Sequence, residues 1–167
     1  MEVYNNGLKQ LDLFNPEFIL MVCNTIHLYH YELQMQIKAE LLDLRKEVEH
    51  ELKQKKITKA MILGTPCTIS LGLYEFAGID YFNPSKEDLV ILSNAVFAFN
   101  KGEEKQKQKQ KVLAIVHKYL SHGAEVVILG CTEFALMLSD EDLPILNTMD
   151  VLVNAVLRKY AKRNGLK

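Results

Sequence analysis

The sequence predicts an α/β protein with a mainly parallel sheet flanked by helices. The main support is a unit that occurs three times, in which an apolar run ends in a polar turn and a helical pattern follows; the runs are residues 18–22, 59–64 and 125–130. Short continuous apolar runs are typical of strands that are buried on both faces, as in parallel sheets. The helical patterns between them indicate the strand–helix–strand connections that a parallel sheet requires.

The first unit places a helix start directly after a strand. Its apolar run ends at Cys23, and apolar residues from Ile26 to Ile37 then recur at helical spacing. Asn24 or Thr25 is therefore expected to cap a helix that begins where the strand stops.

The second and third units repeat this arrangement after an ambiguous segment. Residues 40–44 fit a short strand, and the charged residues after them fit a helix. In the second unit, the turn at residues 65–68 leads into a helix expected at residues 69–76. The third unit continues through Cys131 into the apolar stretch at residues 134–138.

Four more elements are expected from caps and periodicity. Ser85, with Asp88 three residues on, resembles a capping box, and Gly102 is the natural stop of the helix that begins there. A second helix is expected to end at Gly123, where a C-terminal cap belongs. The last two elements are a strand at residues 144–147 and a helix at residues 151–160.

The composition favours a small-molecule site over a nucleic-acid or membrane surface. The 167 residues are 49% hydrophobic, enough to bury a core as one globular unit or two small lobes. The 20 basic and 21 acidic residues give a net charge of -1, so the lysine-rich tract at residues 105–111 is interpreted as a solvated helix face. No run approaches the roughly 18 apolar residues of a membrane helix, and the expected location is the cytoplasm.

Two of the three cysteines hold equivalent places. Cys23 and Cys131 each directly follow a predicted strand and precede a threonine and a helical or apolar stretch. Ligands of open α/β sheets bind at the carboxyl ends of the strands, so both thiols are expected to line one cleft there. The amides of the following turn favour negative charge and are expected to lower the pKa of each thiol.

Other interpretations of these residues are open at this point. Each cysteine alone is more often a small buried hydrophobe than a catalyst. Cys23, His27 and His30 have the helical spacing of metal ligands, but a fourth ligand at fixed spacing is absent, and no metal is expected. Cys67 fits simple packing or a third thiol that is sensitive to oxidation.

Four motifs together resemble the aspartate/glutamate racemase family. Residues 23–27, with the sequence Cys-Asn-Thr-Ile-His, resemble its Cys-Asn-Thr-Ala-His signature, and residues 128–133, with Ile-Leu-Gly-Cys-Thr-Glu, resemble its second cysteine motif. The turn at residues 65–68 is similar to the family's threonine-containing turn. Lys101 falls where aspartate racemases carry a lysine that contacts the substrate.

The resemblance implies a fold of two pseudo-symmetric lobes with mainly parallel sheets. It implies a first lobe at residues 1–56 that residues 145–167 complete, and a second lobe at residues 57–144. Relatives normally carry a glycine-rich strand and loop, a helix and a second strand well before the first cysteine motif. The first lobe is therefore expected to be incomplete, and the chain to be truncated at its N-terminus.

The resemblance also implies a cofactor-independent racemase that interconverts L- and D-aspartate, or glutamate. Cys23 and Cys131 would be the catalytic thiol and thiolate on opposite sides of the substrate, with neither pyridoxal nor a metal. The implied substrate-binding residues are Asn24, Thr25, Thr65, Thr68, Lys101, Thr132 and Glu133. Glu133 resembles aspartate racemases, since glutamate racemases usually have histidine there. The implied partners are the amino-acid substrate and a second copy in a homodimer.

Two alternative functions are kept beside this one. The chain could be a noncatalytic racemase-like protein with a binding or assembly role. It could also be a related thiol-dependent racemase or isomerase that acts on hydantoins, aryl-malonates or maleate. Exchange of a substrate α-proton with solvent deuterium distinguishes an enzyme from a noncatalytic protein.

Overall fold

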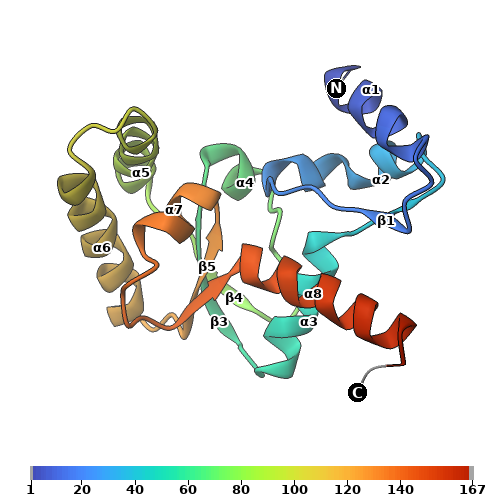
Figure 1. Ribbon diagram of the computed structural model, residues 1–167. Coiled ribbons are helices and arrows are strands. Elements are labelled where there is room, and N and C mark those ends of the chain that lie inside the picture. Colours follow the sequence, from blue (N-terminus) through green and yellow to red (C-terminus); the bar gives the residue numbers. More distant parts are fainter. Residues whose placement is uncertain (1, 166–167) are drawn as a thin grey trace.

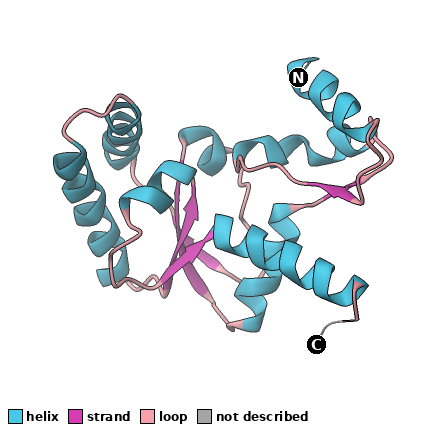
Figure 2. Ribbon diagram, in the orientation of Figure 1, coloured by secondary structure: helices cyan, strands magenta, loops and turns pink. Residues whose placement is uncertain are grey.

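The computed structural model describes residues 2–165 and confirms the predicted α/β class. The strands are β1 (Phe18–Ile19), β2 (Glu40–Leu41), β3 (Lys59–Gly64), β4 (Asp80–Phe82), β5 (Val126–Gly130) and β6 (Ile145–Asn147). The helices are α1 (Glu2–Asp12), the 3-10 helix η1 (Thr25–Tyr29), α2 (His30–Gln34), α3 (Leu44–Gln54), α4 (Pro66–Ser70), α5 (Lys86–Asn100), α6 (Lys105–Ser121), α7 (Thr132–Met137) and α8 (Thr148–Arg163). A larger sheet has the order β4-β3-β5-β6, a smaller sheet pairs β1 with β2, and all of these pairs are parallel (Figures 1 and 2).

Helices cover both faces of the larger sheet and bury its central strands, β3 and β5. Met61 and Leu63 of β3 belong to the core formed with α5, α6 and α7, whereas Ala60 and Ile62 belong to the core formed with α3 and α8. In Figure 1, α5 and α6 lie together on one side of the sheet, and α3 and α8 lie on the other. Burial on both faces explains why continuous apolar runs mark these strands.

The carboxyl ends of β3 and β5 lie side by side and position the segments that follow them. Gly64 pairs with Gly130 in parallel register, so the turn after β3 and Cys131 after β5 start from the same sheet edge. Both glycines make room for Thr68: a Cβ at Gly64 would lie 3.0 Å from the Thr68 side chain, and one at Gly130 would lie 3.3 Å from it. The glycines therefore allow Thr68 to pack directly over the strand ends.

The segment before Cys23 differs from the strand predicted at residues 18–22. Of this run, only the two residues of β1 form a strand. It pairs with β2 on one side, and no other described strand adjoins it. The side chains of Leu20 and Val22 are 38% and 65% exposed. The prediction of a strand buried on both faces is therefore wrong beyond Ile19.

The helix predicted after Cys23 is interrupted and shorter than expected. It begins as η1, continues as α2 and ends at Gln34. Asn24 occupies the N-cap position of η1 with helical φ and ψ of -60° and -55° and makes no capping hydrogen bond. The predicted cap is wrong because the side chains of Asn24 and Thr25 bond to residues that follow β3 instead.

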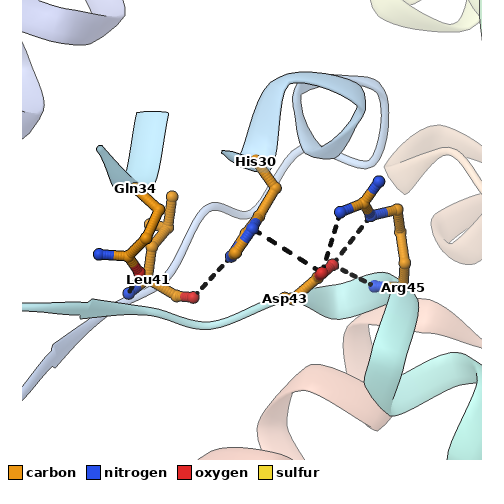
Figure 3. Close-up of polar contacts among 5 residues, drawn as sticks. All are labelled: His30, Gln34, Leu41, Asp43 and Arg45. Carbon is orange, nitrogen blue, oxygen red and sulfur yellow. Dashed lines mark hydrogen bonds and ion pairs between the residues drawn. The ribbon is translucent and has the colours of Figure 1, made fainter. Parts of the chain in front are cut away.

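A polar network fixes the short helix α2 against β2 and the start of α3 (Figure 3). Nε2 of His30 donates to the Leu41 carbonyl at 2.7 Å, and the Leu41 N–H donates to Oε1 of Gln34 at 2.7 Å. Asp43 caps α3 by accepting from the Arg45 N–H at 3.1 Å, and it also accepts from the Arg45 guanidinium at 2.9 Å. The ambiguous segment is thus a short strand followed by a capped helix.

Most predicted boundaries in the second half of the chain are confirmed. The Asp88 N–H donates to the Ser85 hydroxyl at 3.2 Å at the start of α5. Gly102 and Gly123 adopt φ of +77° and +109° just after α5 and α6, in the left-handed region where glycine ends helices. The lysine-rich tract lies at the largely exposed start of α6, and β6 and α8 match the last predicted strand and helix.

Two elements between β3 and α5 differ from the prediction. Helix α4 begins at Pro66 because Thr65 caps it, so the helix predicted at residues 69–76 starts earlier and ends at Ser70. Strand β4, which was not predicted, pairs with β3 at the edge of the larger sheet. Its three residues are exposed or only partly buried, so they lack the apolar run of the central strands.

Helix α8 extends from the larger sheet to the smaller one. Its N-cap residue, Asn147, belongs to β6, and Lys159 near its other end pairs with Glu40 of β2 at 2.6 Å. Between these ends, Leu152 packs into the core shared with α3.

The predicted boundaries of the two lobes stay predictions. No described helix, α8 included, is long and apolar enough to cross a membrane.

Candidate active site

A cavity of about 220 Å³ opens at the carboxyl ends of β3 and β5, and both predicted catalytic cysteines line it. Cys23 reaches it from the loop between β1 and η1, and Cys131 reaches it as the N-cap residue of α7. Besides the cysteines and the apolar residues around them, the lining consists of predicted substrate-binding residues: Asn24, Thr25, Thr65, Thr132 and Glu133. Of the predicted site residues, Thr68 and Lys101 do not line this cavity.

The Cys131 thiol is hydrogen-bonded to a carboxylate. Its Sγ donates to Oε2 of Glu133 at 2.8 Å, and the Thr132 hydroxyl donates to the same oxygen at 3.0 Å. Oε1 of Glu133 accepts from Nδ2 of Asn100, the last residue of α5, at 2.9 Å. Glu133 therefore bridges the end of α5 and the cysteine that starts α7.

Burial and Glu133 hold Cys131 in its protonated form. Cys131 is only 8% exposed, and this burial, together with the hydrogen bond to Glu133 and the charge of that carboxylate, raises the pKa of the thiol to about 12. The prediction of a lowered pKa is wrong for Cys131, because desolvation and a neighbouring carboxylate outweigh the helix amides. Cys23, by contrast, is exposed.

The pKa of Glu133 moves in the opposite direction. Burial by itself would raise it, but the hydrogen bonds that the carboxylate accepts from Cys131, Asn100 and Thr132 keep it below its ordinary value. Glu133 is therefore an ionised acceptor, and the proton that it shares with Cys131 resides on sulfur.

Three threonine hydroxyls form a connected group beside the thiols. The hydroxyl oxygens of Thr25 and Thr68 lie 2.9 Å apart, and those of Thr68 and Thr65 lie 3.1 Å apart. Thr68 is fully buried, whereas Thr25 and Thr65 line the cavity. Thr68 thus links η1 to the start of α4 and holds the other two hydroxyls in place.

Asn24 is a buried amide in the cavity lining. It is 3% exposed, and its Oδ1 accepts a hydrogen bond from the buried hydroxyl of Tyr74. Burial raises the pKa of Tyr74, so this hydroxyl stays a neutral donor. Nδ2 of Asn24 has no hydrogen-bond partner among the described residues. A buried donor without a partner is costly.

Lys101 lies next to the thiol cavity without lining it. Its Nζ is 4.4 Å from the centre of the Phe97 ring. Phe97 lines a second cavity, of about 240 Å³, that shares Thr65 and Val96 with the first. Lys101 therefore lies against an aromatic side chain and does not line the cavity that the thiols share.

The metal site considered at Cys23, His27 and His30 does not form among residues 2–165. Nε2 of His27 donates to the Met21 carbonyl at 3.1 Å, and His30 is held by β2 as described above. Burial lowers the pKa of His27 and favours its neutral form. Cys67, the third cysteine, is exposed on α4 and does not line the thiol cavity.

Sequence reasoning did not assign a role to Asn100 or Tyr74, although both contact residues that line the cavity. Asn100 precedes the lysine that fits the family pattern, and its contact with Glu133 depends on how α5 packs against α7. Tyr74 follows α4, a few residues after the threonine turn, and its contact with Asn24 joins segments 50 residues apart. Polar residues beside recognised motifs were the available signal for both.

Comparisons with known proteins identify the family and agree with the fold. The family model described as Asp/Glu/Hydantoin racemase matches residues 5–156. The chain is 24% identical to the broad specificity amino-acid racemase RacX of Bacillus subtilis, over 93% of this chain and 70% of that protein. It is 28% identical to the glutamate racemase of Helicobacter pylori, over 95% of this chain and 69% of that protein. The crystal structure of an aspartate racemase homologue from Pyrococcus horikoshii superposes with a TM-score of 0.79 at 25% identity, over 94% of this chain and 72% of that one.

Proposed function

Because the chain belongs to the Asp/Glu/Hydantoin racemase family, we propose that it is a cofactor-independent amino-acid racemase in which Cys23 and Cys131 carry the protons. The observation that carries this proposal is the single cavity that both thiols line. Inversion of an α-carbon requires a base on one face and an acid on the other. Two thiols from separate segments around one space are suited to these two roles.

The proposed reaction removes one proton and adds another. The Cys23 thiolate takes the α-proton, so that a C–H bond breaks, an S–H bond forms, and the electron pair is delocalised into the α-carboxylate. The Cys131 thiol then gives its proton to the opposite face, which leaves a thiolate on Cys131. The roles are exchanged for the other enantiomer.

The α-carboxylate would be held by the polar group beside Cys23. Asn24, Thr25 and Thr65 line the cavity, and Nδ2 of Asn24 is a buried donor without a partner among the described residues. The amides near Thr132 add donors at the start of α7, where a helix N-terminus favours an anion. Thr68 supports Thr25 and Thr65 in this proposal and does not meet the substrate itself.

For the substrate we propose aspartate or glutamate. The family's description and relatives named as an aspartate racemase homologue and a glutamate racemase support an acidic amino acid. Lys101 would meet the side-chain carboxylate by moving from its position over the Phe97 ring. The proposal also includes the homodimer and the cytoplasmic location that were expected from the sequence.

Exchange of the substrate α-proton in deuterated water tests the proposed function. The purified protein is expected to exchange the α-proton of aspartate or glutamate, as followed by proton NMR. Cys23→Ser and Cys131→Ser should each lower the rate of racemisation of the pure L- or D-substrate by about 10² or more, because inversion needs an acid–base group on both faces and a serine hydroxyl is a far poorer one. Cys67→Ser is the matched control and should retain the rate.

Two outcomes would contradict the proposed function. One is racemisation that persists at the wild-type rate in both cysteine variants. The other is a folded wild-type protein that exchanges neither acidic amino acids nor neutral amino acids and hydantoins, which would support the noncatalytic alternative. Exchange restricted to neutral substrates would retain the two-thiol reaction and reject the proposed substrate.

A further inference from the structure

The two thiols have unequal surroundings, although they line one cavity. Cys23 is exposed, whereas Cys131 is buried and donates to a carboxylate oxygen at 2.8 Å. That carboxylate is itself held from the other side by Asn100. A mechanism that only needs two equivalent thiols does not require this arrangement.

We propose that Glu133 and Asn100 are positioning residues that keep Cys131 as the protonated thiol, so that Cys131 is the acid of the resting site and the role of base is left to Cys23. This inference rests on the proposed function and assigns Glu133 a role other than the substrate contact expected from the sequence. Glu133 acts through Cys131, and Asn100 acts through Glu133.

The hydrogen-bond directions support the assignment. An ionised carboxylate has acceptors only, so the 2.8 Å contact between Sγ of Cys131 and Glu133 requires the proton on sulfur. Thr132 and Asn100 donate to the same carboxylate at 3.0 and 2.9 Å, which fixes its orientation toward the thiol. Loss of the Cys131 proton would place two negative charges at this distance in a buried site.

The arrangement has a kinetic consequence for the proposed racemase. Each turnover that starts from a Cys23 thiolate ends with a Cys131 thiolate beside Glu133, so the return to the resting form is favoured. The enantiomers have equal free energies in water, and kcat/KM must therefore be the same in both directions. The asymmetry can appear only in the separate values of kcat and KM for the two enantiomers.

The reactivity of the isolated Cys131 thiol tests the inference without any substrate. Cys23→Ser and Cys67→Ser leave Cys131 as the only cysteine of the three. In this background, Glu133→Gln keeps the side-chain shape but removes the charge. We expect the rate of alkylation by iodoacetamide at mildly alkaline pH to rise by about tenfold or more, since the rate follows the thiolate fraction.

Matched variants separate this effect from a general loss of structure. Glu103→Gln removes an equal charge from the exposed loop after α5 and should leave the alkylation rate unchanged. Asn100→Ala should raise the rate in the same direction as Glu133→Gln but by less, because Glu133 is loosened and keeps its charge. Unfolding of each variant is followed by circular dichroism, so that exposure of Cys131 is recognised.

An alkylation rate of folded Glu133→Gln that lies within about twofold of the rate of its parent, which retains Glu133, would overturn the inference. The thiolate fraction of Cys131 would then not depend on the carboxylate. If Glu133→Gln does not fold, titration of the parent by thiolate absorbance decides instead. Cys131 must then stay protonated well above the ordinary thiol pKa of about 8.5, and ionisation at or below that value would overturn the inference. The alkylation rate and the thiol titration need no substrate, so both remain valid if the protein does not racemise amino acids. The inference and the proposed function are therefore tested separately.

Discussion

At the scale of single residues, buried polar groups that meet across the fold shape the candidate site. Tyr74 donates to Oδ1 of Asn24, and the amide nitrogen of Asn24 is a buried donor without a partner among the described residues. Burial of Cys131, with the hydrogen bond to Glu133 and the charge of that carboxylate, raises the pKa of the Cys131 thiol. The motifs identified both cysteines from the sequence and predicted a lowered pKa for each thiol. The raised pKa of Cys131 follows from contacts that only the tertiary structure creates.

Removal of the Tyr74 hydroxyl tests the importance of the Asn24 contact. Tyr74→Phe leaves the buried Oδ1 of Asn24 without its donor, which is expected to reduce the free energy of unfolding by about 1–3 kcal/mol. It should also slow α-proton exchange, since Asn24 is then free to turn. Urea unfolding measures the first effect. Tyr160→Phe is the control, because Tyr160 is 60% exposed; equal stabilities of the two variants would contradict the account.

At the scale of secondary structure, burial decided which elements could be predicted. Strands β3 and β5 are buried on both faces, so their apolar runs marked them in the sequence. Strand β4 at the sheet edge lacks such a run, and the apolar residues after β1 remain exposed instead of extending it. The helix after Cys23 was misjudged because Asn24 and Thr25 bond to the second unit of the chain and not to helix amides.

The capped start of α3 gives a prediction at this scale. Asp43 caps α3 and binds Arg45, so Asp43→Ala is expected to lower the free energy of unfolding at neutral pH by about 1–2 kcal/mol. Burial alone would raise the pKa of Asp43, but the hydrogen bonds and charge of Arg45, with a further contribution from His30, lower it overall. A lowered pKa in the folded state means that this stabilisation is present above the unfolded pKa and is lost as the pH falls through the folded value.

Urea unfolding as a function of pH measures this dependence. The difference between wild type and Asp43→Ala should shrink in acid, below a pH of about 4. Asp142→Ala, at an exposed position, is the control and should have little effect at any pH. A difference that stays constant into acid would show that the charge of Asp43 does not contribute.

At the scale of the whole molecule, α8 connects the larger sheet to the smaller one, which pairs β1 with β2. It does so through apolar packing against α3 and through ion pairs such as Lys159 with Glu40. The pair is partly exposed and is expected to contribute less than about 1 kcal/mol. Burial of Leu152, which is 2% exposed, is expected to dominate.

The relative sizes of these two contributions can be measured. Leu152→Ala should lower the free energy of unfolding by about 2–5 kcal/mol, because it leaves a cavity in the core. Lys159→Ala should change it by less than about 1 kcal/mol. Both values come from urea unfolding followed by circular dichroism. Similar losses in the two variants would show that the ion pairs hold α8 as firmly as its apolar face does.

The incorporation of solvent deuterium during early turnover tests most directly whether two thiols act from opposite sides of one substrate carbon. L-Aspartate is incubated with the protein in deuterated water, and both enantiomers are separated and analysed for deuterium at the α-carbon. The account predicts that newly formed D-aspartate carries deuterium, donated by the thiol opposite the one that removed the proton, while recovered L-aspartate largely retains its original proton. D-Aspartate that retains that proton would contradict the account, because a single group would then have removed and returned it.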